Sequence, residues 1–158
     1  MKKTLALIAS IFTIILSFNF IILQSSMHDV FEKDARNRGV QIYAHYDYFL
    51  NPNVININFW NIEDDKTMAD IDRLLFQFAE LLKDKSYGKV IFSFRFNKKF
   101  FIRGEYFKKI GEEYSYQNPV YLIRKFPEEL YNMDGSKAFS TWTGGLFSVL
   151  KNQMEDHN

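Results

Sequence analysis

The first 24 residues carry an uninterrupted apolar run. No charged residue lies between Lys3 and Asp29, and 13 of the 20 residues in segment 4–23 are Leu, Ile or Phe. Twenty helical residues rise about 30 Å, which is the thickness of the hydrocarbon core of a bilayer. The run is apolar on all sides, which disfavours the buried helix of a soluble core. The pattern therefore predicts a helix that inserts into the membrane bilayer through residues 4–23.

Two fates are open for this segment. A cleaved signal peptide has an apolar region of about 7–15 residues and small residues at its cleavage site. Here the run is longer, and Leu23 or Gln24 occupies a position where cleavage requires a small residue. We therefore favour a retained signal-anchor, and an exported soluble form is the alternative. Because Lys2 and Lys3 adjoin the span, we expect a single-pass protein of the cell membrane with its C-terminal domain outside the cytoplasm.

Alternating polar and apolar positions begin after a polar stretch. Residues 25–39 are polar and end in a glycine, which predicts a helical stalk. Residues 40–50 and 54–60 then alternate with a period of two, as half-buried strands do. The segment Asn51–Asn53 between them contains a proline and predicts a turn. Together these runs predict an antiparallel hairpin.

An amphipathic helix follows the hairpin. Thr67 with Asp70 three residues later resembles a capping box. The apolar stripe behind it has helical spacing and consists of Met68, Ile71, Leu75, Phe78, Ala79 and Leu82. This stripe predicts a helix with one face in the core.

The remaining elements are shorter. Residues 89–96 and 120–125 are typical of strands, and residues 105–114 and 145–156 are typical of helices. Residues 97–103 fit a loop or a short strand. A helix between two strands usually makes a right-handed crossover that joins parallel strands.

These elements predict an α+β fold in which an N-terminal transmembrane helix precedes one small domain. We expect a mixed sheet of about four strands, built from the N-terminal hairpin and two helix crossovers and covered by helices. The expected boundaries are 1–24 for the membrane anchor or signal segment, 25–39 for the polar helical stalk and 40–158 for the single α+β domain. About 130 residues outside the apolar run suit one domain.

The amino-acid composition excludes several kinds of chemical site. Cysteine is absent, which excludes disulfides, thiolate nucleophiles and cysteine-based metal sites. No G-x-S-x-G motif occurs, and there is no zinc signature. We therefore expect no enzyme, no cofactor and no metal site. The chain resembles no characterised family beyond the look of a small bacterial envelope protein with a lysine-led N-terminus.

Charge is unevenly distributed although the whole chain carries only +1. Residues 89–125 contain nine basic and three acidic groups, a local net charge of +6. This basic stretch could be a solvated surface, or it could bind anionic lipid headgroups or an acidic partner. Nucleic acid is not expected for a domain outside the cytoplasm. The candidate binding residues are Arg95, Lys98, Lys99, Arg103, Lys108, Lys109 and Arg124.

The favoured function is that of a membrane-anchored, non-catalytic envelope domain that binds a protein or envelope component. One sheet face, with Gln41, Asn56, Asn58, Ser93 and Arg95, is expected to be exposed and polar. One alternative is a small hydrolase or transferase in which His45 and Asp47, neighbours on one strand face, form a site. The other is a module that binds lipid headgroups or polyanions through the Arg95–Lys109 basic stretch. The ligand and the oligomeric state do not follow from the sequence.

Overall fold

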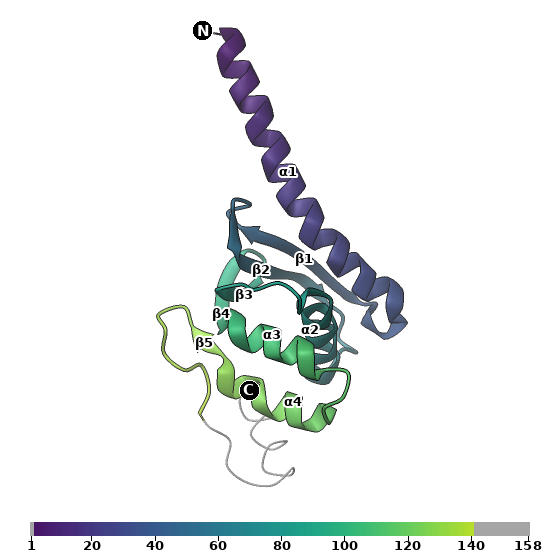
Figure 1. The fold of residues 1–158 in the computed structure, drawn as a ribbon. Coiled ribbons are helices and arrows are strands. Elements are labelled where there is room, and N and C mark those ends of the chain that lie inside the picture. The colour runs from purple at the N-terminus through teal and green to yellow at the C-terminus, as the bar shows by residue number, and fades with distance from the viewer. Residues whose placement is uncertain (1, 141–158) are drawn as a thin grey trace.

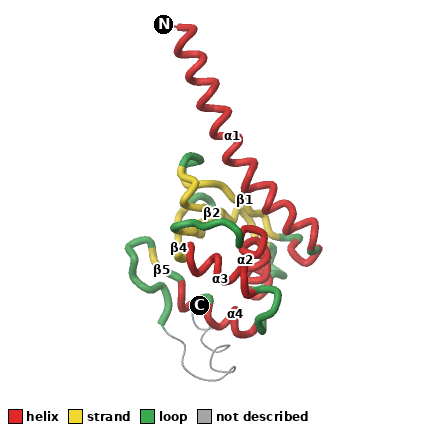
Figure 2. The backbone as a smooth tube through the Cα atoms, in the orientation of Figure 1, coloured by secondary structure: helices red, strands yellow, loops and turns green. Residues whose placement is uncertain are grey.

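A five-stranded mixed sheet lies at the centre of the molecule in a computed structural model that describes residues 2–140 (Figure 1). Its strands follow the order β1-β2-β3-β4-β5, and only the β2–β3 pair is parallel. Helices cover one face, and a long N-terminal helix projects from the domain (Figure 2). The predicted α+β class is confirmed, with five strands in place of about four.

The N-terminal helix α1 (Lys2–Lys33) is continuous. Within the described chain it is the one helix that is long and apolar enough to cross a membrane, and a signal sequence has the same properties. Its side chains are exposed from Lys3 to Ile15, whereas Leu23, Met27 and Val30 are buried in the core. Residues 25–33 therefore pack on the domain, in contrast to the stalk expected from their polarity.

A polar clasp fixes the end of α1 to the domain. The 3₁₀ turn Ala35–Asn37 follows α1, and buried Asn37 donates from Nδ2 to the Val30 carbonyl at 3.1 Å and to Gln77 Oε1 at 2.6 Å. Gln77 also donates to Asp34, which holds two ion pairs with arginines. Because Gln77 lies on α2, these bonds tie the first helix to the second.

Strands β1 (Val40–Asp47) and β2 (Asn51–Ile62) form the predicted antiparallel hairpin. Its turn, however, lies at Tyr48 and Phe49, where φ is +51° and +59°, and not at Asn51–Asn53, which begin β2. A two-residue turn with positive φ at both positions matches the twist of the strands. Proline is compatible with the beginning of a strand, so the sequence pattern misplaced the turn.

Helix α2 (Met68–Leu82) crosses from β2 to the parallel strand β3 (Lys89–Phe94), as predicted. The capping box is present, because Asp70 N donates to Thr67 Oγ1 and Thr67 N donates to Asp70 Oδ2. The apolar stripe of α2 is buried in the core from Ile71 to Leu82, whereas Met68 at its start is exposed.

The predicted second crossover is wrong. Strand β3 turns at Arg95 and Phe96, with φ +48° and +64°, directly into the antiparallel strand β4 (Asn97–Arg103). Helix α3 (Gly104–Glu113) comes after β4 and packs on α2. The short-strand alternative for residues 97–103 is thus confirmed, and the sheet gains a second hairpin.

Helix α4 (Pro119–Lys125) replaces the strand predicted at residues 120–125. Asn118 caps it by accepting from Val120 N at 2.9 Å, and Pro119 occupies the first turn, where a missing N–H has no cost. These two residues start the helix although the sequence that follows has strand character. The 3₁₀ turn Pro127–Glu129 and the edge strand β5 (Tyr131–Asn132) complete the fold. The helix predicted at 145–156 lies outside the described residues.

Two glycines permit close contacts around α3. A Cβ atom on Gly111 would lie 2.3 Å from the backbone oxygen of Ala79 on α2. A Cβ atom on Gly104 would lie 1.7 Å from the backbone oxygen of Tyr87. Both distances are far below van der Waals contact, so α3 approaches its neighbours as closely as it does only because these positions lack a side chain.

Candidate binding pocket

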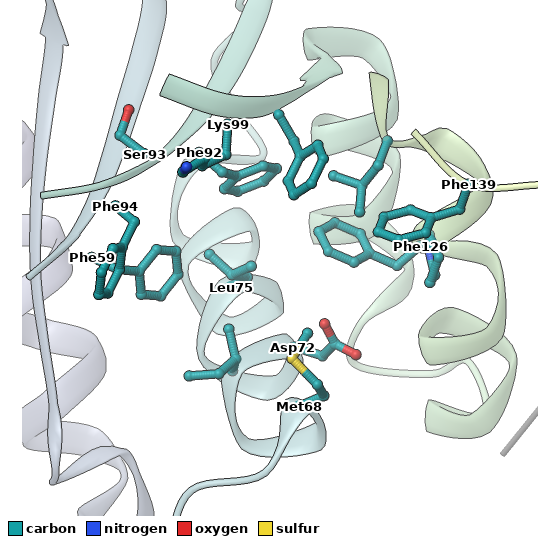
Figure 3. Close-up of a pocket in the computed structure, with 14 residues that line it drawn as sticks. Phe59, Met68, Asp72, Leu75, Phe92, Ser93, Phe94, Lys99, Phe126 and Phe139 are labelled. Carbon is teal, nitrogen blue, oxygen red and sulfur yellow. The ribbon is translucent and has the colours of Figure 1, made fainter. Parts of the chain in front are cut away.

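A cavity of about 230 Å³ lies between the sheet, α2 and the segment from α4 to β5 (Figure 3). We call the sheet face that lines it the pocket face. Phenylalanines from five places in the chain contribute six of its fourteen lining residues. The lining residues are Phe59, Met68, Ile71, Asp72, Leu75, Phe92, Ser93, Phe94, Lys99, Phe100, Phe126, Pro127, Leu130 and Phe139.

The alternation of side chains along the strands brings four phenylalanines to the same face of the sheet. Phe59 on β2 pairs with Phe94 on β3, and Phe92 pairs with Phe100 on β4, so these side chains share the pocket face. Phe126, at the end of α4, closes the opposite side with its ring 5.9 Å from that of Phe92. The helix α4 that the sequence pattern missed therefore supplies one wall of the pocket.

One acidic side chain lies in this apolar wall. Asp72 on α2 is 2% exposed, and its Oδ1 atom has no hydrogen-bond partner in the described chain. Burial among aromatic groups raises the pKa of Asp72 to about 7. A buried carboxyl without a partner is costly, and such groups are concentrated at functional sites. Asp72 is thus the one buried carboxyl among the residues that line the pocket.

The sequence contains a signal for Asp72 that the periodicity of apolar residues does not reveal. The residue lies four positions after Met68 and three before Leu75, and therefore on the apolar stripe of α2. An acidic residue on the core side of an amphipathic helix is a candidate functional group. The pattern of apolar residues alone passes over it.

The candidate basic residues do not gather on one surface. Lys99 is exposed at the pocket, whereas Lys98 points to the other face and forms an ion pair with Asp47 at 2.8 Å. Arg95 lies in the β3–β4 turn and Arg103 at the end of β4. On α3, Lys108 and Lys109 pair with Glu112 and Glu113 at 3.9 and 3.8 Å, and Arg124 is on α4. A binding role for this set remains a prediction.

We call the sheet face that carries His45, Asn56, Asn58 and Ser93 the polar face. These four side chains are buried, whereas Gln41 and Arg95 are exposed as expected. Ser93 donates to Asn56 Oδ1 at 2.9 Å, and Asn58 Oδ1 accepts from Phe96 N in the β3–β4 turn. Lys98 Nζ on β4 reaches Asp47 on β1 across the two intervening strands, which indicates that the sheet curls over this face. The hairpin ends thus cover polar groups that alternation alone places in solvent.

His45 and Asp47 do not form the expected pair. His45 stacks on Phe49 with ring centroids 4.5 Å apart, and its Nδ1 lies 2.8 Å from the Tyr46 carbonyl. The Asp47 carboxylate is engaged by Lys98. These contacts give His45 a packing role, and neither of them involves the Asp47 carboxylate.

In residues 2–140, no group of three or more His, Asp or Glu side chains has the arrangement of a metal site. Comparison with protein-family models, with curated proteins and with solved structures finds no match for the chain. The pocket around Asp72 therefore carries the functional argument by its geometry alone.

Proposed function

We propose that this chain is a membrane-anchored, non-catalytic binding domain that holds an aromatic side chain of a protein partner in the Asp72 pocket. The observation that supports the proposal is an apolar cavity with a single buried, unpaired carboxylate oxygen in its wall. Interface hot spots are commonly aromatic side chains that fill such desolvated pockets.

The size of the pocket favours an anchor side chain over a whole cofactor. Its volume of about 230 Å³ is below the range of about 300–1,000 Å³ that is usual for small-molecule sites. Tryptophan and tyrosine each combine an apolar body with one hydrogen-bond donor. That donor would satisfy Asp72 Oδ1, and the ring would contact the surrounding phenylalanines.

The proposed location follows from α1. Residues 4–23 would hold the protein in the cell membrane with the domain outside the cytoplasm, and cleavage would give an exported soluble form instead. An envelope protein is then the partner that the pocket can reach. The paired state of Lys98, Lys108 and Lys109 favours this pocket over the basic stretch as the binding surface.

The first test compares indole with N-methylindole on the full chain in nanodiscs at pH 8, where Asp72 is ionised. We expect saturable binding of indole and about tenfold weaker binding of N-methylindole, because a hydrogen bond to a charged group contributes about 1.5 kcal/mol. Ligand-observed NMR measures both affinities. Asp72→Leu should abolish the preference, and Leu75→Trp, which fills the cavity, should abolish binding of both probes.

Two outcomes would contradict the proposal. Equal affinities for the two probes in the wild-type chain would remove Asp72 as the recognition group. Binding that occurs only in a Trp142→Ala variant would identify the chain's own C-terminal tryptophan as the occupant.

The partner class is tested in cells by site-specific photo-crosslinking. Phe94 lines the pocket and is 40% exposed, so a benzoylphenylalanine at this position should crosslink to an envelope protein. The crosslink should disappear in the Leu75→Trp background. The matched control is Tyr116, which is 70% exposed and does not line the pocket. Equal crosslinking from both positions would indicate nonspecific proximity and count against a specific partner.

A further inference from the structure

The tip of the β1–β2 hairpin lies against the part of α1 that is assigned to the membrane. Asn19 Nδ2 donates to the Phe49 carbonyl at 2.8 Å, and the rings of Phe20 and Phe49 have centroids 6.1 Å apart. Both helix residues fall inside the predicted span 4–23. Figure 1 shows the tip on the side of the domain from which α1 projects.

The part of α1 that makes no contact with the domain is too short to cross the hydrocarbon core of a bilayer. Contact with the hairpin tip begins at Asn19, and Leu23 at the end of the span is completely buried in the core. Residues 3–18 would thus project from the tip over about 24 Å at 1.5 Å per residue. The hydrocarbon core of a bilayer is about 30 Å thick, so a deficit of about 6 Å remains. A full crossing of the bilayer by α1 would draw the hairpin tip into the membrane interface.

The exposed surface of the tip suits that environment. Tyr48 is 74% exposed and Leu50 is 45% exposed. Tyrosine is enriched where the bilayer meets water, because its ring is apolar and its hydroxyl is polar. The Lys98 ammonium lies 4.7 Å from the centre of the Tyr48 ring, which places a basic group at the expected level of the headgroups.

The conformation of the turn is consistent with a role beyond chain reversal. Positive φ at both positions of a two-residue turn favours Asn-Gly, because bulky side chains are strained there. Tyr48 and Phe49 hold these positions instead. Phe49 contacts Phe20 and His45, while Tyr48 points its apolar surface to the outside. The strained turn thus directs the Tyr48 ring towards solvent and packs the Phe49 ring against the domain and α1.

We propose that Tyr48 and Leu50 insert into the membrane–water interface, so that the domain contacts by its hairpin tip the same bilayer that α1 crosses. The partner is the lipid surface itself. The inference rests on the proposed membrane insertion of α1, and it does not depend on the pocket. The proposed lipid-contacting surface is therefore the hairpin tip and not the basic stretch.

The test uses nitroxide labels on single cysteines, which are unique because the chain has no native cysteine. Labels replace Tyr48, Leu50, Tyr116 or Ile14 in the full chain reconstituted in liposomes. Power-saturation EPR measures the collision of each label with oxygen and with an aqueous nickel relaxant. Ile14, 66% exposed in mid-span, reports the insertion of α1, and Tyr116 is the aqueous control.

We expect a deep position for the Ile14 label, an aqueous position for Tyr116 and an intermediate depth for Tyr48 and Leu50. Nickel collision at Tyr48 and Leu50 should be several-fold lower than at Tyr116. If Ile14 is deep while both tip labels match Tyr116, the tip contact is overturned and the anchor stands. If Ile14 is as aqueous as Tyr116, the anchor fails and the tip contact fails with it.

Discussion

Asp72→Asn is expected to stabilise the domain by about 2 kcal/mol at pH 8 and to destabilise it by about 2 kcal/mol near pH 4. The shift of the Asp72 pKa from 3.8 to about 7 corresponds to about 4 kcal/mol at about 1.4 kcal/mol per unit. Burial of an incompletely bonded amide offsets about half of this gain. Chemical denaturation of the full chain in detergent, followed by near-UV circular dichroism, measures the difference.

The sign follows from proton linkage. The folded state binds the Asp72 proton more tightly than the unfolded state, so the contribution of Asp72 to the free energy of unfolding falls as pH rises from about 4 to 7. Above about pH 7 the destabilisation that ionised Asp72 causes no longer changes with pH. The stability difference between Asp72→Asn and the wild-type chain should therefore grow across this window. Stability curves that stay parallel from pH 4 to 8 would contradict burial of the carboxyl.

Asp70, on the same helix, is expected to show the opposite dependence of stability on pH. Hydrogen bonds from Thr67 and Arg73 lower the pKa of Asp70 to about 2. Its stabilisation is present above pH 4 and is lost as pH falls towards 2. Asp70→Asn should consequently destabilise the domain by about 1 kcal/mol at neutral pH, as expected for the loss of a helix cap.

Gly111→Ala is expected to destabilise the domain by about 3 kcal/mol or more. The added methyl group would meet the Ala79 backbone oxygen at 2.3 Å, and α2 and α3 would have to separate. Alanine has a higher helix propensity than glycine by about 1 kcal/mol, so a loss of stability can be attributed to the helix contact. The same denaturation assay measures the effect.

Two further variants test whether the effect of Gly111→Ala comes from the contact between α2 and α3. Glu112→Ala changes the neighbouring exposed residue and should leave stability nearly unchanged. Ala79→Gly should not rescue Gly111→Ala, because the clash involves the backbone of residue 79 and not its side chain. Wild-type stability of Gly111→Ala would show that the two helices are not in close contact.

The sequence predicted the elements that local patterns determine. The β1–β2 hairpin, the capping box at Thr67 and the α2 crossover follow from periodicity and capping chemistry, and all three are present. Residues 120–125 show the limit of that reasoning. Their composition favours a strand, but the Asn118 cap and Pro119 start a helix, and its Leu122 is buried in the core.

The candidate site was less predictable because tertiary contacts create it. Phe126 and Phe139 enter the pocket from segments with no clear pattern, and the burial of Asp72 depends on both sides of the cavity. The polar face is a similar case. Asn58 is buried by a turn from a different hairpin, and no local signal in its own strand reports that contact.

The continuity of α1 has a mechanical consequence. The helix contains no glycine or proline between its apolar half and the residues buried in the domain, so the junction has no hinge. If α1 is retained as a membrane anchor, as proposed, a change in bilayer thickness that alters the tilt of this helix would therefore rotate the entire domain with it. The same sequence would then present its pocket at different angles in thin and thick membranes.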